Sequence, residues 1–225
     1  MDWLLPILIF SLVAGLINFL SLNDPEIRMK MQEKQMEKIE KNFNKLVENG
    51  TISQEKADEQ LDKISERMSE QLQKGRWIQL ISIFLVTFIL FFILAGFYYL
   101  VMKYGFKGSG TYKDAMTAYG LPYYILTLSY IVVGLTMFLL SKPLQSVSVG
   151  ALLDYDSGTI VGLLLNKLDV FAIWFYTVIG IGFAKMFDIK STKKVILWIY
   201  VIWIGFSLLL YFAGELFPFL KFFGF

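Results

Sequence analysis

Charged side chains are concentrated in one segment of this chain, and the rest of the sequence is nearly free of them. Residues 24–76 hold 12 acids and 11 bases, more than half of the charged side chains in the 225 residues. The remainder is dominated by apolar and aromatic side chains, with Phe alone present 21 times. Because so apolar a sequence exceeds what a water-soluble domain carries, we interpret residues 24–76 as a polar insert in a membrane protein.

Five apolar stretches are long enough to cross a bilayer. About 20 mainly apolar residues are needed, because the hydrocarbon core is ~30 Å thick and a helix rises ~1.5 Å per residue. The stretches are residues 3–22, 77–102, 121–140, 168–187 and 195–214. The sequence therefore predicts an all-α, polytopic membrane protein with about five transmembrane helices, whose first partner is the lipid bilayer.

The chain divides into three parts on this interpretation. Residues 1–22 form the first transmembrane helix, residues 23–76 an extramembrane hairpin, and residues 77–225 a four-helix transmembrane region. A weaker stretch at 143–166 contains Asp154 and Asp156 and is interpreted as a surface or re-entrant segment. Its two carboxylates could bind a cation, but the pattern favours a capped turn leading into a helix at Thr159.

Composition excludes several functions. The chain has no His and no Cys, which removes the usual zinc sites, a Cys nucleophile, a Ser-His-Asp triad and any disulfide. A net charge of +2 is not that of a nucleic-acid binder. We expect no enzymatic activity, no cofactor, no metal and no nucleic-acid partner.

The polar insert has the pattern of two amphipathic helices joined by a tight reversal. Asp24-Pro25-Glu26 is typical of a helix start, and Asn49-Gly50 of a helix end. Apolar residues recur at spacings of three and four on both sides of the reversal. Antiparallel, coiled-coil-like pairing gives a predicted hairpin core that consists of Met36, Ile39, Phe43, Leu46, Ala57, Leu61, Ile64 and Met68.

Charges on the two predicted arms are complementary. The first arm carries a basic side of Lys34, Lys38, Lys41 and Lys45, and the second an acidic side of Asp58, Asp62, Glu66 and Glu70. We expect these sides to face each other and the hairpin to stand well clear of the bilayer. Two functions stay open for it: a docking arm for a partner, or a solvated spacer that orients two transmembrane helices.

Several motifs in the later part of the chain resemble the YIP family of five-span membrane proteins. They are Gly110-Thr111-Tyr112-Lys113-Asp114, the Ala118–Pro122 run that opens the third stretch, Leu168–Trp174 at the start of the fourth, Gly180-Ile181-Gly182, and Lys190–Lys194. A charged segment with a Gly-x-x-Ser-Gln-Glu turn, as at residues 50–55, is similar to prokaryotic members. Unlike many members, this sequence starts directly at the first apolar stretch, so no role of a cytoplasmic N-terminal segment is carried over.

The resemblance implies a five-span fold, and for eukaryotic members a role in membrane traffic with prenylated Rab-type GTPases; for prokaryotic members it implies no particular activity. Our leading hypothesis is a membrane scaffold or adaptor that engages protein partners. The first alternative is a small-solute channel or transporter, which needs polar groups at mid-depth. The second is an Oxa-type insertase, for which Asn18 in the first stretch is the main polar candidate.

The candidate functional residues lie in or beside these motifs: Asp169, Trp174, Lys185, Asp188, Tyr112, Lys113 and Pro122. Asp169 has two interpretations, because an acid at a span entrance is either a functional charge or a helix cap. Lys185 and Asp188 are spaced to pair with each other, and snorkelling of the lysine to the membrane surface is the alternative.

Loop charges predict the orientation. The loops after the second and fourth stretches carry seven lysines, whereas the opposite side has three outside the hairpin. Counting short loops and discounting the near-neutral hairpin places the N-terminus inside the cell, and the hairpin and C-terminus outside. The prokaryotic resemblance makes the plasma membrane the expected location.

Overall fold

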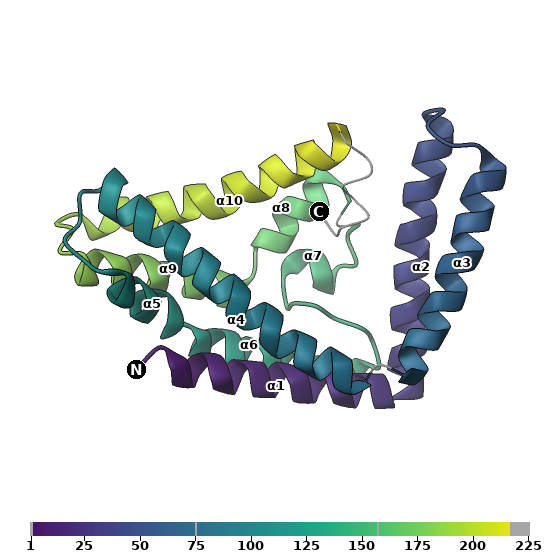
Figure 1. Cartoon of the computed structure of the whole chain (residues 1–225), viewed down its shortest axis with the longest axis horizontal. Coiled ribbons are helices and arrows are strands. Elements are labelled where there is room, and N and C mark those ends of the chain that lie inside the picture. Colours follow the sequence, from purple (N-terminus) through teal and green to yellow (C-terminus); the bar gives the residue numbers. More distant parts are fainter. Residues whose placement is uncertain (1, 75, 157, 217–225) are drawn as a thin grey trace.

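The computed structural model describes residues 2–74, 76–156 and 158–216. In these residues all regular secondary structure is helical, and turns and loops connect the helices. In chain order the elements are α1 (Leu4–Asn23), α2 (Pro25–Glu48), α3 (Gln54–Lys74), α4 (Arg76–Leu100), the π-helical turn η1 (Val101–Gly105), α5 (Tyr112–Gly120), α6 (Tyr123–Leu140), α7 (Val149–Leu152), α8 (Ile160–Lys167), α9 (Val170–Met186) and α10 (Thr192–Leu216). Figure 1 shows a helical bundle with the α2–α3 hairpin set apart at one end.

Four helical segments are long and apolar enough to cross a membrane: Leu4–Asn23, Leu80–Gly105, Tyr112–Leu140 and Thr192–Leu216. A fifth span results if α8 and α9, which meet at a 65° bend, are taken together. The prediction of an all-α polytopic membrane protein is therefore confirmed. The sequence did not predict α5, which extends the third span toward the N-terminus because Thr111 and Asp114 cap it there.

Aromatic rings fill the centre of the bundle. Phe91 on α4 is fully buried and stacks on Trp3 and Tyr119, with ring centroids 5.4 and 5.8 Å away. Tyr123 of α6 and Phe175 of α9 meet the same cluster edge-on. Outside this core, α4 exposes large apolar side chains such as Leu85 and Ile93, as a lipid-facing surface does.

The last two spans pack closely. A Cβ atom on Gly180 of α9 would lie 2.7 Å from Ile196 Cγ1 of α10, so only glycine permits this approach. One helical turn earlier in α9, the ring of Tyr176 stacks on that of Trp203 in α10, with ring centroids 4.3 Å apart. The Tyr200 hydroxyl of α10 donates to the Ile173 carbonyl of α9 at 2.8 Å. These contacts fix α10 against α9.

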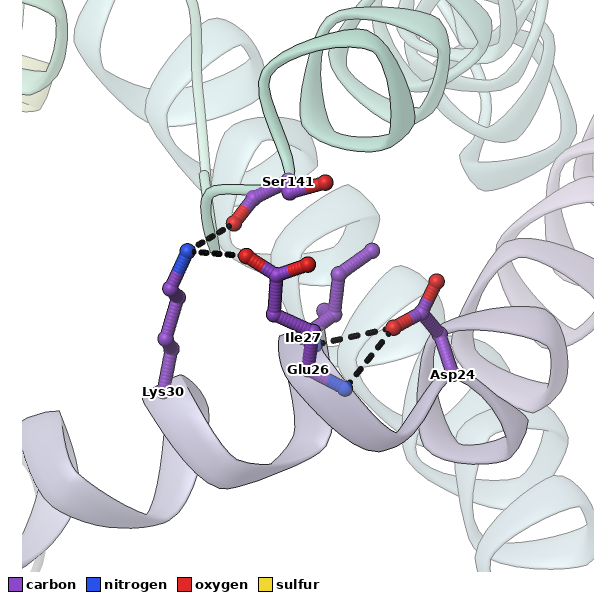
Figure 2. A network of polar contacts seen from close by, with 5 residues as sticks. All are labelled: Asp24, Glu26, Ile27, Lys30 and Ser141. Carbon is purple, nitrogen blue, oxygen red and sulfur yellow. Dashed lines mark hydrogen bonds and ion pairs between the residues drawn. The ribbon is translucent and has the colours of Figure 1, made fainter.

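The hairpin begins at the predicted cap. The Asp24 carboxylate accepts hydrogen bonds of 3.0 Å from the backbone N–H groups of Glu26 and Ile27, as Figure 2 shows. Its turn is closed by Gly50, whose φ of +69° is unfavourable for other residues. The backbone N–H of Thr51 then returns to the Leu46 carbonyl at 2.8 Å.

The hairpin core is most deeply buried near its turn. Phe43, Leu46 and Ala57 are buried, whereas the other described members of the predicted core are half-buried: Met36, Ile39, Leu61 and Ile64. The side chain of Met68 lies outside the described part of the chain. The buried residues thus lie along the predicted contact, or seam, between the two arms, and their burial decreases with distance from the turn.

The hairpin is joined to the bundle by polar contacts of its first arm. Its first arm runs crosswise to α1 (Figure 1) and contacts the connection between α6 and α8. The Lys30 ammonium donates to the Ser141 carbonyl at 2.9 Å, a contact drawn in Figure 2. Lys34 and Lys41 lie 3.6 and 3.8 Å from carboxylate oxygens of two aspartates in that connection.

Those aspartates are Asp154 and Asp156, so Lys34 and Lys41 pair with acids of another segment instead of facing only the second arm. Asp154 also pairs with Lys142 at the end of α6. The bundle thus supplies acids that local charge patterning within residues 23–76 could not reveal.

A pH dependence follows for this contact. The hydrogen bond from Lys142, reinforced by its charge and that of Lys34, holds the pKa of Asp154 below its ordinary value of 3.8. A carboxyl with a lowered pKa stabilises the contact above its unfolded-state pKa and loses that effect as pH falls through the folded-state value. The distance between spin labels at Glu37→Cys and Leu152→Cys is therefore expected to stay constant from pH 8 to 5. The distribution of this distance should broaden below about pH 4. The Asp154→Asn variant should show a weaker pH response, and an unchanged one would contradict this assignment.

Truncating Phe43 tests the hairpin seam. Phe43 is 7% exposed, whereas Lys41 on the same arm is exposed. Phe43→Ala is expected to cost the lower part of the ~3–5 kcal/mol seen for buried Phe, because a two-helix seam packs incompletely. Backbone hydrogen exchange of residues 36–64 should therefore be faster in the full-length Phe43→Ala variant than in the unchanged protein. The exchange rates of the Lys41→Ala variant should be much closer to those of the unchanged protein. Equal acceleration in both variants would place the seam elsewhere.

Candidate functional site at the junction of two loops

Two loops far apart in sequence form one surface at the end of the bundle opposite the hairpin. We call it the junction and define it as residues 103–114 and 185–194. The Ser109 N–H donates to the Phe187 carbonyl at 3.1 Å, and the Ser109 hydroxyl donates to Asp188 Oδ2 at 3.0 Å. The loop after η1 is thereby tied to the turn between α9 and α10.

Glycines make this close contact possible. Phe187 is fully buried and lies against Gly108 and Gly110. A Cβ atom would stand 2.8 Å from Phe187 Cβ at Gly108, and 2.7 Å from Phe187 Cγ at Gly110. Such distances are too short for carbon atoms, so the glycines serve close packing with the Phe187 ring.

The start of α5 is fixed at the junction by a capping box. The Thr111 hydroxyl accepts from the Asp114 N–H, while the Asp114 carboxylate accepts from the Thr111 N–H at 2.8 Å. The neighbouring Tyr112 hydroxyl donates to the Phe92 carbonyl of α4 at 3.0 Å. Its ring meets Tyr99 edge-on, so Tyr112 joins α5 to α4.

The junction is rich in lysine. Its lysines, which also predict the orientation, are Lys103, Lys107, Lys113, Lys185, Lys190, Lys193 and Lys194. All but Lys103 are exposed. Its two acids are engaged locally, Asp114 with Thr111 and Asp188 with Ser109. The predicted pairing of Lys185 with Asp188 is replaced by this contact with Ser109.

The sequence profile of the Yip1 domain matches residues 1–213. The chain belongs to the Yip1-domain family. No curated protein and no solved structure matches it. The resemblance drawn from the sequence is thus confirmed, and the Gly110–Asp114 motif behind it lies within the junction.

The remaining candidate residues of this Yip1-domain chain lie away from the junction. Pro122 is the N-cap residue of α6. Trp174 is 49% exposed on α9. Asp169 precedes α9 at the opposite end of that helix. Of the seven predicted residues the structure therefore brings together Tyr112, Lys113, Lys185 and Asp188, and separates the other three.

Asp169 acts as a helix cap. Its carboxylate accepts from the backbone N–H groups of Phe171 and Ala172 at 2.8 and 3.1 Å, and the residue is only 5% exposed. It lies in the bend between α8 and α9, where the change of direction leaves the first amides of α9 without helical partners. The capping interpretation therefore accounts for its contacts.

A buried polar network beside this bend was missed from the sequence. The Ser148 hydroxyl, fully buried, lies 2.9 Å from Asn166 Oδ1 and 2.8 Å from the Ser146 hydroxyl. The Val149 N–H donates to the Leu168 carbonyl at 3.0 Å. These contacts hold α7 against the end of α8. Nothing in the local sequence marks Asn166 as a partner of Ser148.

Asp169 variants separate capping from a functional charge. Asp169→Asn is expected to keep the thermal stability of the detergent-solubilised protein, because Asn caps about as well as Asp. Asp169→Leu is expected to lose ~0.5–2 kcal/mol, the usual cost of a lost cap. If Asp169→Asn kept full stability yet abolished partner capture or solute flux, Asp169 would have a role beyond capping.

A metal site does not emerge from the described residues. They contain no group of three or more His, Cys, Asp or Glu side chains suited to hold a metal ion. Asp154 and Asp156, considered as cation ligands from the sequence, instead pair with lysines, and Asp156 Oδ1 also accepts from the Gly158 N–H. Thr159 caps α8 as expected.

Proposed function

We propose that this chain is a non-enzymatic membrane scaffold or adaptor that binds protein partners through its helical hairpin. The observation that carries the proposal is the hairpin itself. Two helices of 24 and 21 residues extend from the bundle, and no extensive contact joins the described part of α3 to a membrane-spanning helix. A spacer between α1 and α4 would not need so long an exposed surface.

A shallow groove near the turn supports a docking role. Apolar side chains of Phe43, Leu46, Ile52 and Ile64 line it, and its edge carries Lys56, Glu59 and Gln60. Its volume is about 610 Å³. An apolar floor with charges of both signs at the edge suits an amphipathic segment of another protein.

The same proposal places the chain in the plasma membrane, with the N-terminus inside and the hairpin outside. The lysines of the junction support this orientation, because short basic loops stay on the cytoplasmic side. Lys34 and Lys41 of the first hairpin arm pair with aspartates. Because these acids neutralise their charge, the two lysines argue less strongly for a cytoplasmic hairpin than unpaired bases would.

Photocrosslinking tests the docking role. A photoreactive amino acid at Gln60 is expected to give a discrete crosslinked protein in native membranes, whereas the same group at lipid-facing Leu85 is not. The substitution Ile52→Glu, which places a charge in the groove, should abolish the adduct, and Lys63→Glu, outside the groove, should keep it. Equal crosslinking at Gln60 and Leu85, or an adduct that survives Ile52→Glu, would contradict docking in the groove.

A solute transporter is the second candidate, favoured by the broken pair α8–α9. Transporter sites often lie where a membrane helix is interrupted, and here the 65° bend coincides with buried Asp169 and Ser148. The contacts of both side chains are explained by capping, so this candidate ranks second. Flux in proteoliposomes that depended on Asn166 or Asp169 would reverse the ranking.

A further inference from the structure

The lysines of the junction lie at the ends of membrane spans. Lys103 belongs to η1 at the end of the second span, and Lys113 to the first turn of α5, where the third begins. Lys193 and Lys194 occupy the first turn of α10. Exposed Tyr104 and partly exposed Tyr112 lie among them, and tyrosine at a span end is typical of headgroup depth.

These lysines lack the acidic partners that bases have at the other end of the molecule. There, Lys34, Lys41 and Lys142 pair with aspartates. Within the described residues, no lysine of the junction lies within 4.0 Å of a carboxylate oxygen. Seven lysines against two locally engaged aspartates leave a strong positive excess on one surface.

Three of the lysines also occupy unfavourable helix positions. The N-terminal end of a helix carries partial positive charge, so a lysine in the first turn is destabilising. Lys193 and Lys194 have this position in α10, whose first turn carries no acid, and Lys113 has it in α5, where Asp114 is next to it. An anion beside them would be attracted by the helix end and the ammonium groups together, which offers a reason for this placement.

We propose that the junction binds the phosphate groups of anionic phospholipids in the adjacent leaflet, with Lys113, Lys193 and Lys194 as principal contacts. The contacts of Ser109 with Phe187 and Asp188 hold the two loops together, so both contribute to one surface. Juxtamembrane lysines are attracted to anionic leaflets in this way. This lipid contact is independent of the partner proposed for the hairpin.

Native mass spectrometry of the full chain in detergent tests the proposal. The protein is expected to retain phosphatidylglycerol in preference to phosphatidylcholine. The triple variant K113Q/K193Q/K194Q should weaken phosphatidylglycerol binding roughly tenfold or more, in line with several lysines acting together. The matched variant K34Q/K41Q/K142Q removes the same charge at the other end and should stay within about twofold of the unchanged protein.

Melting temperatures distinguish a phospholipid from free phosphate as the ligand. Phosphatidylglycerol should raise the melting temperature of the unchanged protein, while inorganic phosphate at the same concentration should not; equal shifts would replace the lipid by free phosphate and overturn the proposal. No preference for phosphatidylglycerol in the unchanged protein, or equal weakening in both triple variants, would also overturn it. The preference in the unchanged protein is measured whether or not the variants fold.

Discussion

Replacing Phe91 by alanine is expected to lower the free energy of unfolding by ~3–5 kcal/mol, the range for a fully buried Phe. Phe91 is 0% exposed and contacts the rings of Trp3, which caps the start of α1, of Tyr119 in α5 and of Tyr123 in α6. A cavity at this point removes contacts between four helices at once. Unfolding by SDS titration in mixed micelles measures the loss.

Phe206 provides the matched control. It is 60% exposed on α10 and so faces the lipid. Phe206→Ala removes the same atoms without leaving an internal cavity, and we expect a loss below ~1 kcal/mol. Similar losses in the two variants would mean that the aromatic cluster around Phe91 does not hold the bundle together.

Replacing Gly110 by valine is expected to disrupt the junction. A Cβ atom alone would lie 2.7 Å from two atoms of the Phe187 ring, and this ring is fully buried and cannot withdraw. Overpacking costs typically ~1–3 kcal/mol, and the two added methyl groups favour the upper end. The melting temperature in detergent should fall, and hydrogen exchange at residues 106–114 should accelerate.

A second substitution and a control show whether the clash is responsible. Phe187→Leu removes ring atoms that the new side chain meets, so adding it should restore part of the stability lost in Gly110→Val. Gly205→Ala is the control, because no atom lies within 4 Å of a Cβ there and alanine is the better helix former. No rescue by Phe187→Leu, together with a loss for Gly205→Ala, would contradict the steric account.

Sequence reasoning predicted the spans because bilayer thickness sets their length, and composition marks them without tertiary knowledge. It also placed the Asp24 cap and the reversal at Gly50, since both depend on neighbouring residues. The start of α5 was missed although a local signal exists. Thr111 and Asp114 have the spacing of a capping box, and recognising it would have moved the predicted start of this span back from Leu121.

Other features depend on contacts between distant segments, so the sequence alone could not reveal them. Ser109 and Asp188 are 79 residues apart, and only the packing of α5 against α9 brings them together. Lys34 and Lys41 were assigned to the neighbouring arm, because charge patterning compares residues close in sequence. Their partners Asp154 and Asp156 are more than 100 residues away.

The two ends of the molecule differ in chemistry, with the lysine-rich junction at one end and the hairpin at the other. If the spans cross the membrane as proposed, the two ends face opposite sides, and both proposed binding roles depend on this arrangement. The chain has no Cys, so a single introduced thiol can be labelled without background. Gln60 in the exposed part of the hairpin and Lys190 in the junction are suitable positions.

Labelling of Gln60→Cys and Lys190→Cys in intact cells by a membrane-impermeant maleimide is the most direct test of this arrangement. We expect Gln60→Cys to react in intact cells and Lys190→Cys to react only after the membrane is opened. Reaction of Lys190→Cys in intact cells with protection of Gln60→Cys would reverse the orientation. Reaction of both from the same side would contradict the five-span arrangement itself.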